Sequence, residues 1–135
     1  MVTRKINPST LPKPHGHAQI IVASGGTLVF TSGQVAIDPD EKLIGDGPDY
    51  RAQARQTAEN VYAAVAAAGL TPADIVRLTI YVVDPAPENL EELYVGLGEA
   101  GAAAGAKSTA MTLIGVTGLS FPGAVVEMDA TAIGE

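Results

Sequence analysis

The chain has 135 residues and a net charge of −7, with no cysteine, 47% hydrophobic residues and 17% charged residues. This composition is typical of one ordered globular domain, residues 1–135, and it excludes disulfides, thiol nucleophiles and cysteine-ligated zinc. The sequence has no cluster of cations for phosphates, no apolar run long enough to span a membrane and no hydrophobic signal-peptide core, so we expect a cytoplasmic protein that binds neither nucleic acid nor membrane.

Hydrophobic periodicity and turn residues divide the chain into six strands and two helices. In chain order the expected elements are strands 3–6, 19–23 and 27–31, a helix over 50–68, a strand over 76–83, a helix over 88–103, and strands 109–116 and 124–133. Ser24-Gly25-Gly26, between the second and third strands, predicts a hairpin. Residues 32–48 are rich in Gly, Asp and Pro and predict a long loop.

This order of elements predicts an α+β fold, a two-layer sandwich in which both helices cover one face of a mixed sheet of about six strands. In the last strand Val126 and Met128 alternate with Glu127 and Asp129. The apolar side chains should therefore face the helices, and the two carboxylates should lie on the opposite face. No further element is left to cover that face, so we expect a partner subunit there.

Several sequence blocks run in order along nearly the whole chain. The main ones are GGTLVFTSGQ at 25–34, QARQTAENV at 53–61, TLIGV at 112–116 and VEM at 126–128. Together they resemble the Rid family of reactive intermediate deaminases, also called the YjgF or endoribonuclease L-PSP family. The resemblance implies a chorismate-mutase-like fold, a homotrimer, and clefts between subunits that bind small molecules. It also implies hydrolysis of enamines and imines, such as 2-aminoacrylate, to keto acids and ammonia.

Active members of this family use a glutamate on the last strand, an arginine that binds the substrate carboxylate, and a tyrosine in the N-terminal loop. Glu127 matches the glutamate and is the expected catalytic residue, which holds or activates water. No arginine of this chain falls at the position of the family arginine. One register puts Lys107 at its position, whereas the register that keeps TLIGV aligned, which we favour, puts Met111 there. The tyrosine position falls at or beside His17.

The expected substrate-binding residues are His17, Ser32, Gly33, Met111 and Leu113. His15 and His17 are the only histidines and have no third ligand at suitable spacing, so we expect neither a metal nor a cofactor. Met111 removes a cation and adds a flexible apolar side chain. We therefore expect a divergent deaminase-type hydrolase that acts on C=N bonds and is inefficient on 2-aminoacrylate. The alternative is a non-catalytic trimer that binds a small metabolite or a pathway enzyme.

Overall fold

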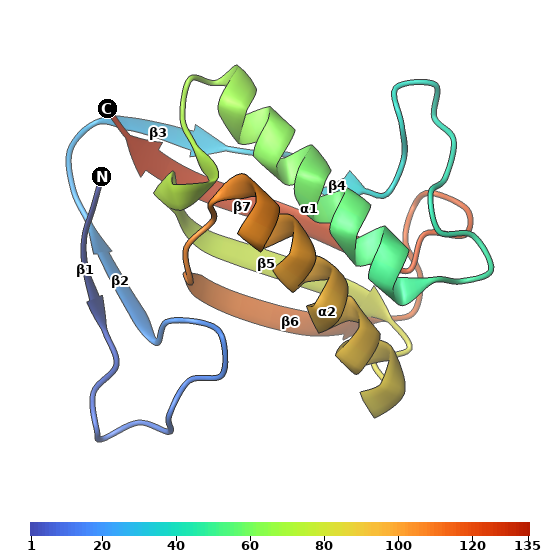
Figure 1. The fold of residues 1–135 in the computed structure, drawn as a ribbon, viewed down its shortest axis with the longest axis horizontal. Coiled ribbons are helices and arrows are strands. Elements are labelled where there is room, and N and C mark those ends of the chain that lie inside the picture. The colour runs from blue at the N-terminus through green and yellow to red at the C-terminus, as the bar shows by residue number, and fades with distance from the viewer.

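The computed structural model describes residues 1–135 (Figure 1). Its elements are β1 (Val2–Ile6), β2 (Ile20–Ala23), β3 (Thr27–Phe30), β4 (Gln34–Val35), α1 (Tyr50–Ala67), the short 3-10 helix η1 (Pro72–Asp74), β5 (Ile75–Val83), α2 (Pro87–Ala104), β6 (Ala110–Val116) and β7 (Val126–Gly134). Both expected helices and all six expected strands are present, with ends that differ by at most two residues. Neither α1 nor α2 has the length and apolar character that a membrane crossing requires.

The main sheet has five strands, and β7 lies inside it. The strand order is β3-β7-β5-β6, and β4 also pairs with β7. β5 and β6 are parallel, while β7 is antiparallel to β3 and to β5. Helices α1 and α2 pack side by side over one face (Figure 1). The expected α+β sandwich is therefore confirmed, but the expected sheet of six strands is divided, because β1 and β2 form a separate two-stranded sheet.

The hairpin predicted around Gly25 and Gly26 is wrong. β2 pairs with β1, and β3 pairs with β7, so the two glycines direct the chain from one sheet to the other. Both have positive φ, and a Cβ on Gly26 would lie 2.2 Å from the Gly134 carbonyl oxygen. Gly25 and Gly26 do form a turn. β3 does not pair with β2, because the nine-residue β7 offers it a longer edge.

The alternation predicted for the last strand is confirmed. Val126, Met128 and Ala132 are each 0% exposed and face the helices, while Glu127 and Asp129 lie on the opposite face. The helices supply the other half of this core with Val61, Val65 and Leu93 among other residues. Because β7 is buried on one face and paired on both edges, it has little freedom to move within the fold.

One buried polar side chain joins α1 to the segment that precedes β7. Gln53 is 0% exposed. Its Nε2 donates to the Gly45 carbonyl at 3.1 Å and to the Gly123 carbonyl at 3.0 Å, and its Oε1 accepts from the Val125 backbone N–H at 2.8 Å. Both amide hydrogens and the amide oxygen are thus used. Since Val125 directly precedes β7, this amide fixes where the strand begins.

A second amide on α1 holds the segment around β4. The Nδ2 of Asn60 donates to the Val35 carbonyl at 2.8 Å and to the Ile37 carbonyl at 2.9 Å. Its Oδ1 accepts from the Gln56 amide at 2.9 Å. Gln53, Gln56 and Asn60 all belong to the QARQTAENV block, so this block has an architectural role in the fold.

Replacing Gln53 with Ala should lower the free energy of unfolding by about 2 kcal/mol, because it leaves the Val125 N–H and the Gly123 carbonyl without partners. The Gly45 carbonyl keeps its bond from the Asp49 N–H. Urea unfolding followed by circular dichroism measures the change. Arg55→Ala is the matched control on the same helix, since its ion pair with Glu59 is exposed and should contribute less than about 1 kcal/mol. Equal effects of the two substitutions would contradict this account of Gln53.

Helices α1 and α2 approach each other most closely at Gly96. A Cβ at this position would lie 2.1 Å from the carbonyl oxygen of Arg51. Gly98 differs, since a Cβ there would meet nothing within 4 Å. Only the first of these two helical glycines is therefore required by packing within the chain.

We expect Gly96→Ala and Gly98→Ala to change stability in opposite directions. The first should destabilise the protein by roughly 1–3 kcal/mol, because the helices must separate. The second should stabilise it by about 0.5–1 kcal/mol, because alanine loses less backbone entropy in a helix. Thermal unfolding of the two variants measures both shifts, and a loss of stability in Gly98→Ala would show that this glycine has a packing role.

Candidate functional site

The uncovered face of the sheet carries the two carboxylates of β7. Glu127 lies opposite Tyr81 on β5, and Asp129 lies opposite Thr79. The Tyr81 hydroxyl donates a hydrogen bond of 3.0 Å to Oδ2 of Asp129. This bond, together with partial burial and the nearby carboxylates, raises the pKa of Tyr81. Asp129 is therefore occupied by a neighbour within the chain.

The Glu127 carboxylate packs against Gly33 and has no other partner in the chain. A Cβ on Gly33 would lie 2.6 Å from Oε2 of Glu127, so glycine is the residue that leaves room for this side chain. The Glu127 side chain makes no hydrogen bond or ion pair within the chain. Ser32 precedes Gly33, and its carbonyl accepts from the Gln34 side chain at 3.3 Å. The carboxylate is free to bind water or a ligand.

Apolar side chains surround these carboxylates on the same face. Phe30 is 71% exposed, Leu28 is 54% exposed and Ile114 is 42% exposed. Their neighbours in register are Thr131 for Phe30, Ile133 for Leu28 and Tyr81 for Ile114, which places them on the side of the sheet that the helices do not cover. Large apolar side chains gathered on one face are typical of a surface that another protein covers.

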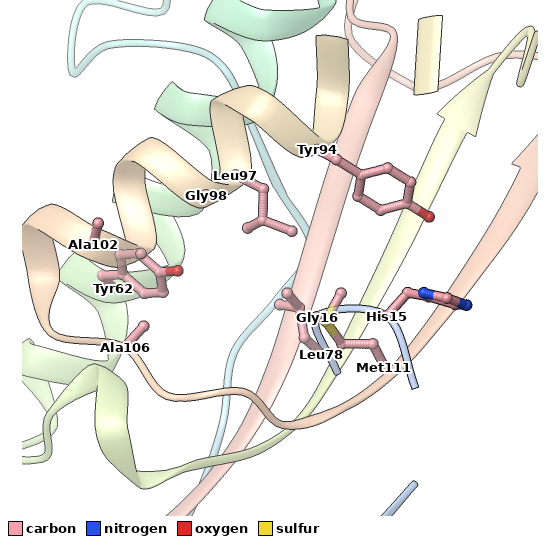
Figure 2. Close-up of a pocket in the computed structure, with 11 residues that line it drawn as sticks. His15, Gly16, Tyr62, Leu78, Tyr94, Leu97, Gly98, Ala102, Ala106 and Met111 are labelled. Atoms are coloured by element: carbon pink, nitrogen blue, oxygen red, sulfur yellow. The ribbon is translucent and has the colours of Figure 1, made fainter. Parts of the chain in front are cut away.

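A cavity of about 330 Å³ lies on the helix side of the sheet, between α2, β6 and the segment that joins β1 to β2 (Figure 2). Leu78, Leu97 and Met111 form its apolar walls, and His15, Tyr62 and Tyr94 supply its polar side chains. No Lys, Arg, Asp or Glu lines it. The cavity therefore suits a molecule with a mainly apolar surface.

The sequence-predicted residues fall on both sides of the sheet. Glu127 and Gly33 are in contact on the uncovered face, whereas Met111 and Leu113 lie beside Leu78 and Ile80 on the helix face. Met111 lines the cavity and Leu113 packs beside the core. One chain therefore does not bring Glu127 together with Met111, and a shared role for them stays a prediction.

Met111 and Lys107, the two residues that the alternative registers put at the arginine position, lie in different places in the fold. Met111 lines the cavity, whereas Lys107 is exposed in the segment before β6 and does not line it. In the N-terminal segment it is His15 that lines the cavity. His17 is half-buried, with its Nδ1 3.4 Å from the His15 carbonyl oxygen. No three His, Asp or Glu side chains gather where they could hold a metal ion.

Sequence reasoning missed Tyr62 and Tyr94 as cavity residues. Helical spacing assigned both to the apolar sides of their helices, and spacing does not distinguish a core position from the wall of a cavity. A usable signal was present in α2, where Gly98 and Gly101 are placed in a helix interior at a cost in stability. Both glycines line the cavity.

Comparison with known proteins gives a consistent result. The profile described as Endoribonuclease L-PSP matches residues 11–134. A 2-iminobutanoate/2-iminopropanoate deaminase of Salmonella typhimurium is 49% identical over 59 residues, so the match spans only 44% of this chain and 44% of that protein. The Yersinia pestis protein YyfB, a Rid family protein of unknown function, is 34% identical, with a TM-score of 0.85 over 97% of this chain and 98% of that one. Escherichia coli TdcF with bound serine is 26% identical, with a TM-score of 0.71 over 98% of this chain and 100% of that one.

Asp129→Asn should lower the pKa of Tyr81, because the hydrogen bond to the carboxylate is the main cause of the raised value. The bond stabilises the fold fully at pH values below the ordinary tyrosine pKa of about 10. This stabilisation is lost as the pH rises through the raised pKa of Tyr81 in the folded protein. Ultraviolet titration of phenolate absorbance should show one tyrosine ionising at lower pH in the variant. Tyr81→Phe should remove that component, and identical titrations of Asp129→Asn and the unaltered protein would contradict the assignment.

Proposed function

Because the chain belongs to the endoribonuclease L-PSP family, also known as the YjgF/Rid family, we propose that it is a divergent Rid-type hydrolase acting on the C=N bond of an imine, or of an enamine after tautomerisation. The deaminase activity named for the Salmonella relative supports this reaction class. The observation that carries the proposal is the Glu127 carboxylate, which lies against Gly33 with no partner in the chain to occupy it.

The proposed chemistry is the addition of water to a C=N bond. Glu127 takes a proton from the attacking water while the water oxygen bonds to the imine carbon. The carboxylic acid then returns this proton to the nitrogen of the tetrahedral carbinolamine. Glu127 then takes the hydroxyl proton and passes it to the leaving nitrogen, so that cleavage of the C–N bond releases ammonia and leaves a carbonyl compound. Each turnover consumes one imine and one water, and no metal or redox step is required.

A homotrimer forms part of the proposal, since Glu127 and the cavity lie on opposite faces of one sheet. A single ligand can reach both only if Glu127 of one subunit lies next to the cavity of another. The exposed Leu28, Phe30 and Ile114 beside Glu127 support contact between copies on this face. The clefts between subunits that the family resemblance implies are consistent with such a site.

The proposed substrate is not a simple 2-imino acid. A carboxylate is best bound by the two parallel N–H donors of an arginine, and Met111 lines the cavity where the family alignment expects that arginine. TdcF was crystallised with serine, an amino acid that carries a carboxylate. The same substitution favours the second candidate function, a trimer that binds a metabolite without turning it over.

Glu127→Gln should reduce imine hydrolysis by at least about 100-fold, because it removes the proton acceptor while keeping the shape of the side chain. Diphenylmethanimine is a suitable uncharged probe, since its hydrolysis to benzophenone and ammonia is followed by ultraviolet absorbance. Asp129→Asn is the matched control on the same strand and face, and it should keep most of the activity. We expect 2-aminoacrylate, formed in a coupled assay, to be hydrolysed slowly.

Full activity in Glu127→Gln would contradict the catalytic role of this residue. Ligand binding without hydrolysis by the unaltered protein would support the non-catalytic candidate instead. Sedimentation analysis tests the trimer, and a monomer that is fully active would contradict a site shared between subunits.

A further inference from the structure

We infer that the cavity between α2, β6 and the segment that joins β1 to β2 binds an uncharged, mainly apolar molecule. The hydroxyl of Tyr62, which reaches this cavity from α1, donates a hydrogen bond to the acceptor group of the molecule. The inference rests on the proposed function for the reaction that follows, and it adds the chemical class of the ligand. Carbonyl compounds without a carboxylate, and the imines and enamines derived from them, belong to this class.

The first support is a tyrosine hydroxyl that has no hydrogen-bond partner within the chain. Tyr62 is only 9% exposed, and its hydroxyl makes no hydrogen bond within the chain, whereas those of Tyr50 and Tyr81 donate to the Val83 carbonyl and to Asp129. Figure 2 shows the Tyr62 oxygen directed into the cavity. Burial raises the pKa of Tyr62, so the hydroxyl keeps its proton at neutral pH. The hydroxyl oxygen is not sealed inside the core, so its donor is available to an acceptor group of a molecule in the cavity.

The second support comes from the glycines of α2 in the cavity wall. A glycine inside a helix costs stability, and the close helix contact that explains Gly96 does not explain its neighbours. A Cβ on Gly98 would meet nothing within 4 Å, and a Cβ on Gly101 would lie 3.5 Å from the Tyr62 hydroxyl oxygen. Both glycines line the cavity. The missing side chain of Gly101 leaves space beside the hydroxyl, and that of Gly98 leaves space elsewhere in the cavity wall. A ligand would use both spaces.

The third support is the absence of charge from the cavity wall. Leu78, Leu97 and Met111 supply apolar surface, and no Lys, Arg, Asp or Glu lines the space. A carboxylate bound here would lose hydration without gaining a cationic partner. The volume of about 330 Å³ lies within the usual range for small-molecule sites, roughly 300–1,000 Å³. Size and chemistry therefore favour a neutral compound that has an acceptor for the Tyr62 hydroxyl.

Calorimetric titration with two ligands of the same skeleton tests this selection. The probes are 4-phenylbutan-2-one, a neutral ketone, and 2-oxo-4-phenylbutanoate, in which a carboxylate replaces the methyl group of that ketone. We expect the unaltered protein to bind the ketone at least about tenfold more tightly, because the carboxylate must be desolvated. Met111→Arg should reduce or reverse this preference, because it supplies the missing cation.

Two variants test the wall of the cavity. Tyr62→Phe should weaken ketone binding by roughly two- to tenfold, as expected for one lost hydrogen bond. Tyr50→Phe is the matched control, since Tyr50 does not line the cavity, and it should leave binding unchanged. Gly98→Leu should abolish binding by filling the space while leaving the melting temperature no lower, which separates loss of the site from loss of the fold.

The inference is overturned if the ketone does not bind, if the carboxylate binds equally well, or if either Tyr62→Phe or Gly98→Leu binds the ketone normally. Because titration requires no turnover, its outcome is separate from that of the proposed function. Ketone binding without imine hydrolysis would contradict the hydrolase alone. Hydrolysis that depends on Glu127, with no preference for the ketone, would contradict the neutral-ligand cavity alone.

Discussion

The three hydrogen bonds of the buried Gln53 amide determine where β7 enters the sheet. They join α1 to the segment before β7 and to the loop around Gly45. With Val125 held in this way, the alternation along the strand leaves no choice about which side chains face the helices and which face outward. A shift of one residue would put Glu127 into the apolar core and Met128 outside. The position of the candidate acid therefore depends on an amide that lies far from any ligand.

This arrangement places the candidate catalytic carboxylate and the candidate ligand cavity on opposite faces of the sheet. β7 puts Glu127 on the uncovered face, and the helices cover the cavity on the other. A sheet cannot pass a ligand from one face to the other, because its backbone groups are paired along every inner edge. The exposed Phe30 and Leu28 beside Glu127 lie on the same surface as the acid. A contact that covered them would also remove the carboxylate from bulk water, which strengthens its interactions with a bound ligand.

Local patterns were sufficient for the helices and for the buried face of β7, because 3.6-residue and two-residue periods depend only on neighbours in sequence. They failed at the Gly25-Gly26 turn, since β3 pairs with a strand that lies about a hundred positions later in the chain and sequence proximity has no bearing on that choice. They also failed at Tyr62, because a helix stripe shows which side chains point inward but not whether the interior is filled. Met111 lines the cavity, but its expected place at the position of the family arginine rests on the family resemblance and stays a prediction.

The loss of the arginine changes where binding energy comes from. A carboxylate bound by two N–H donors is oriented by a strong and directional contact, whereas the walls formed by Leu78, Leu97 and Met111 attract a ligand in proportion to its buried area and with little directional preference. Such a cavity can hold a substrate without holding its reacting atom in one place. A single directed group in the cavity wall would restore the orientation, because a hydrogen bond gives a ligand a preferred direction that apolar contacts lack. Tyr62 supplies that group, and a nearby Gly101 without a side chain leaves the ligand room to reach it.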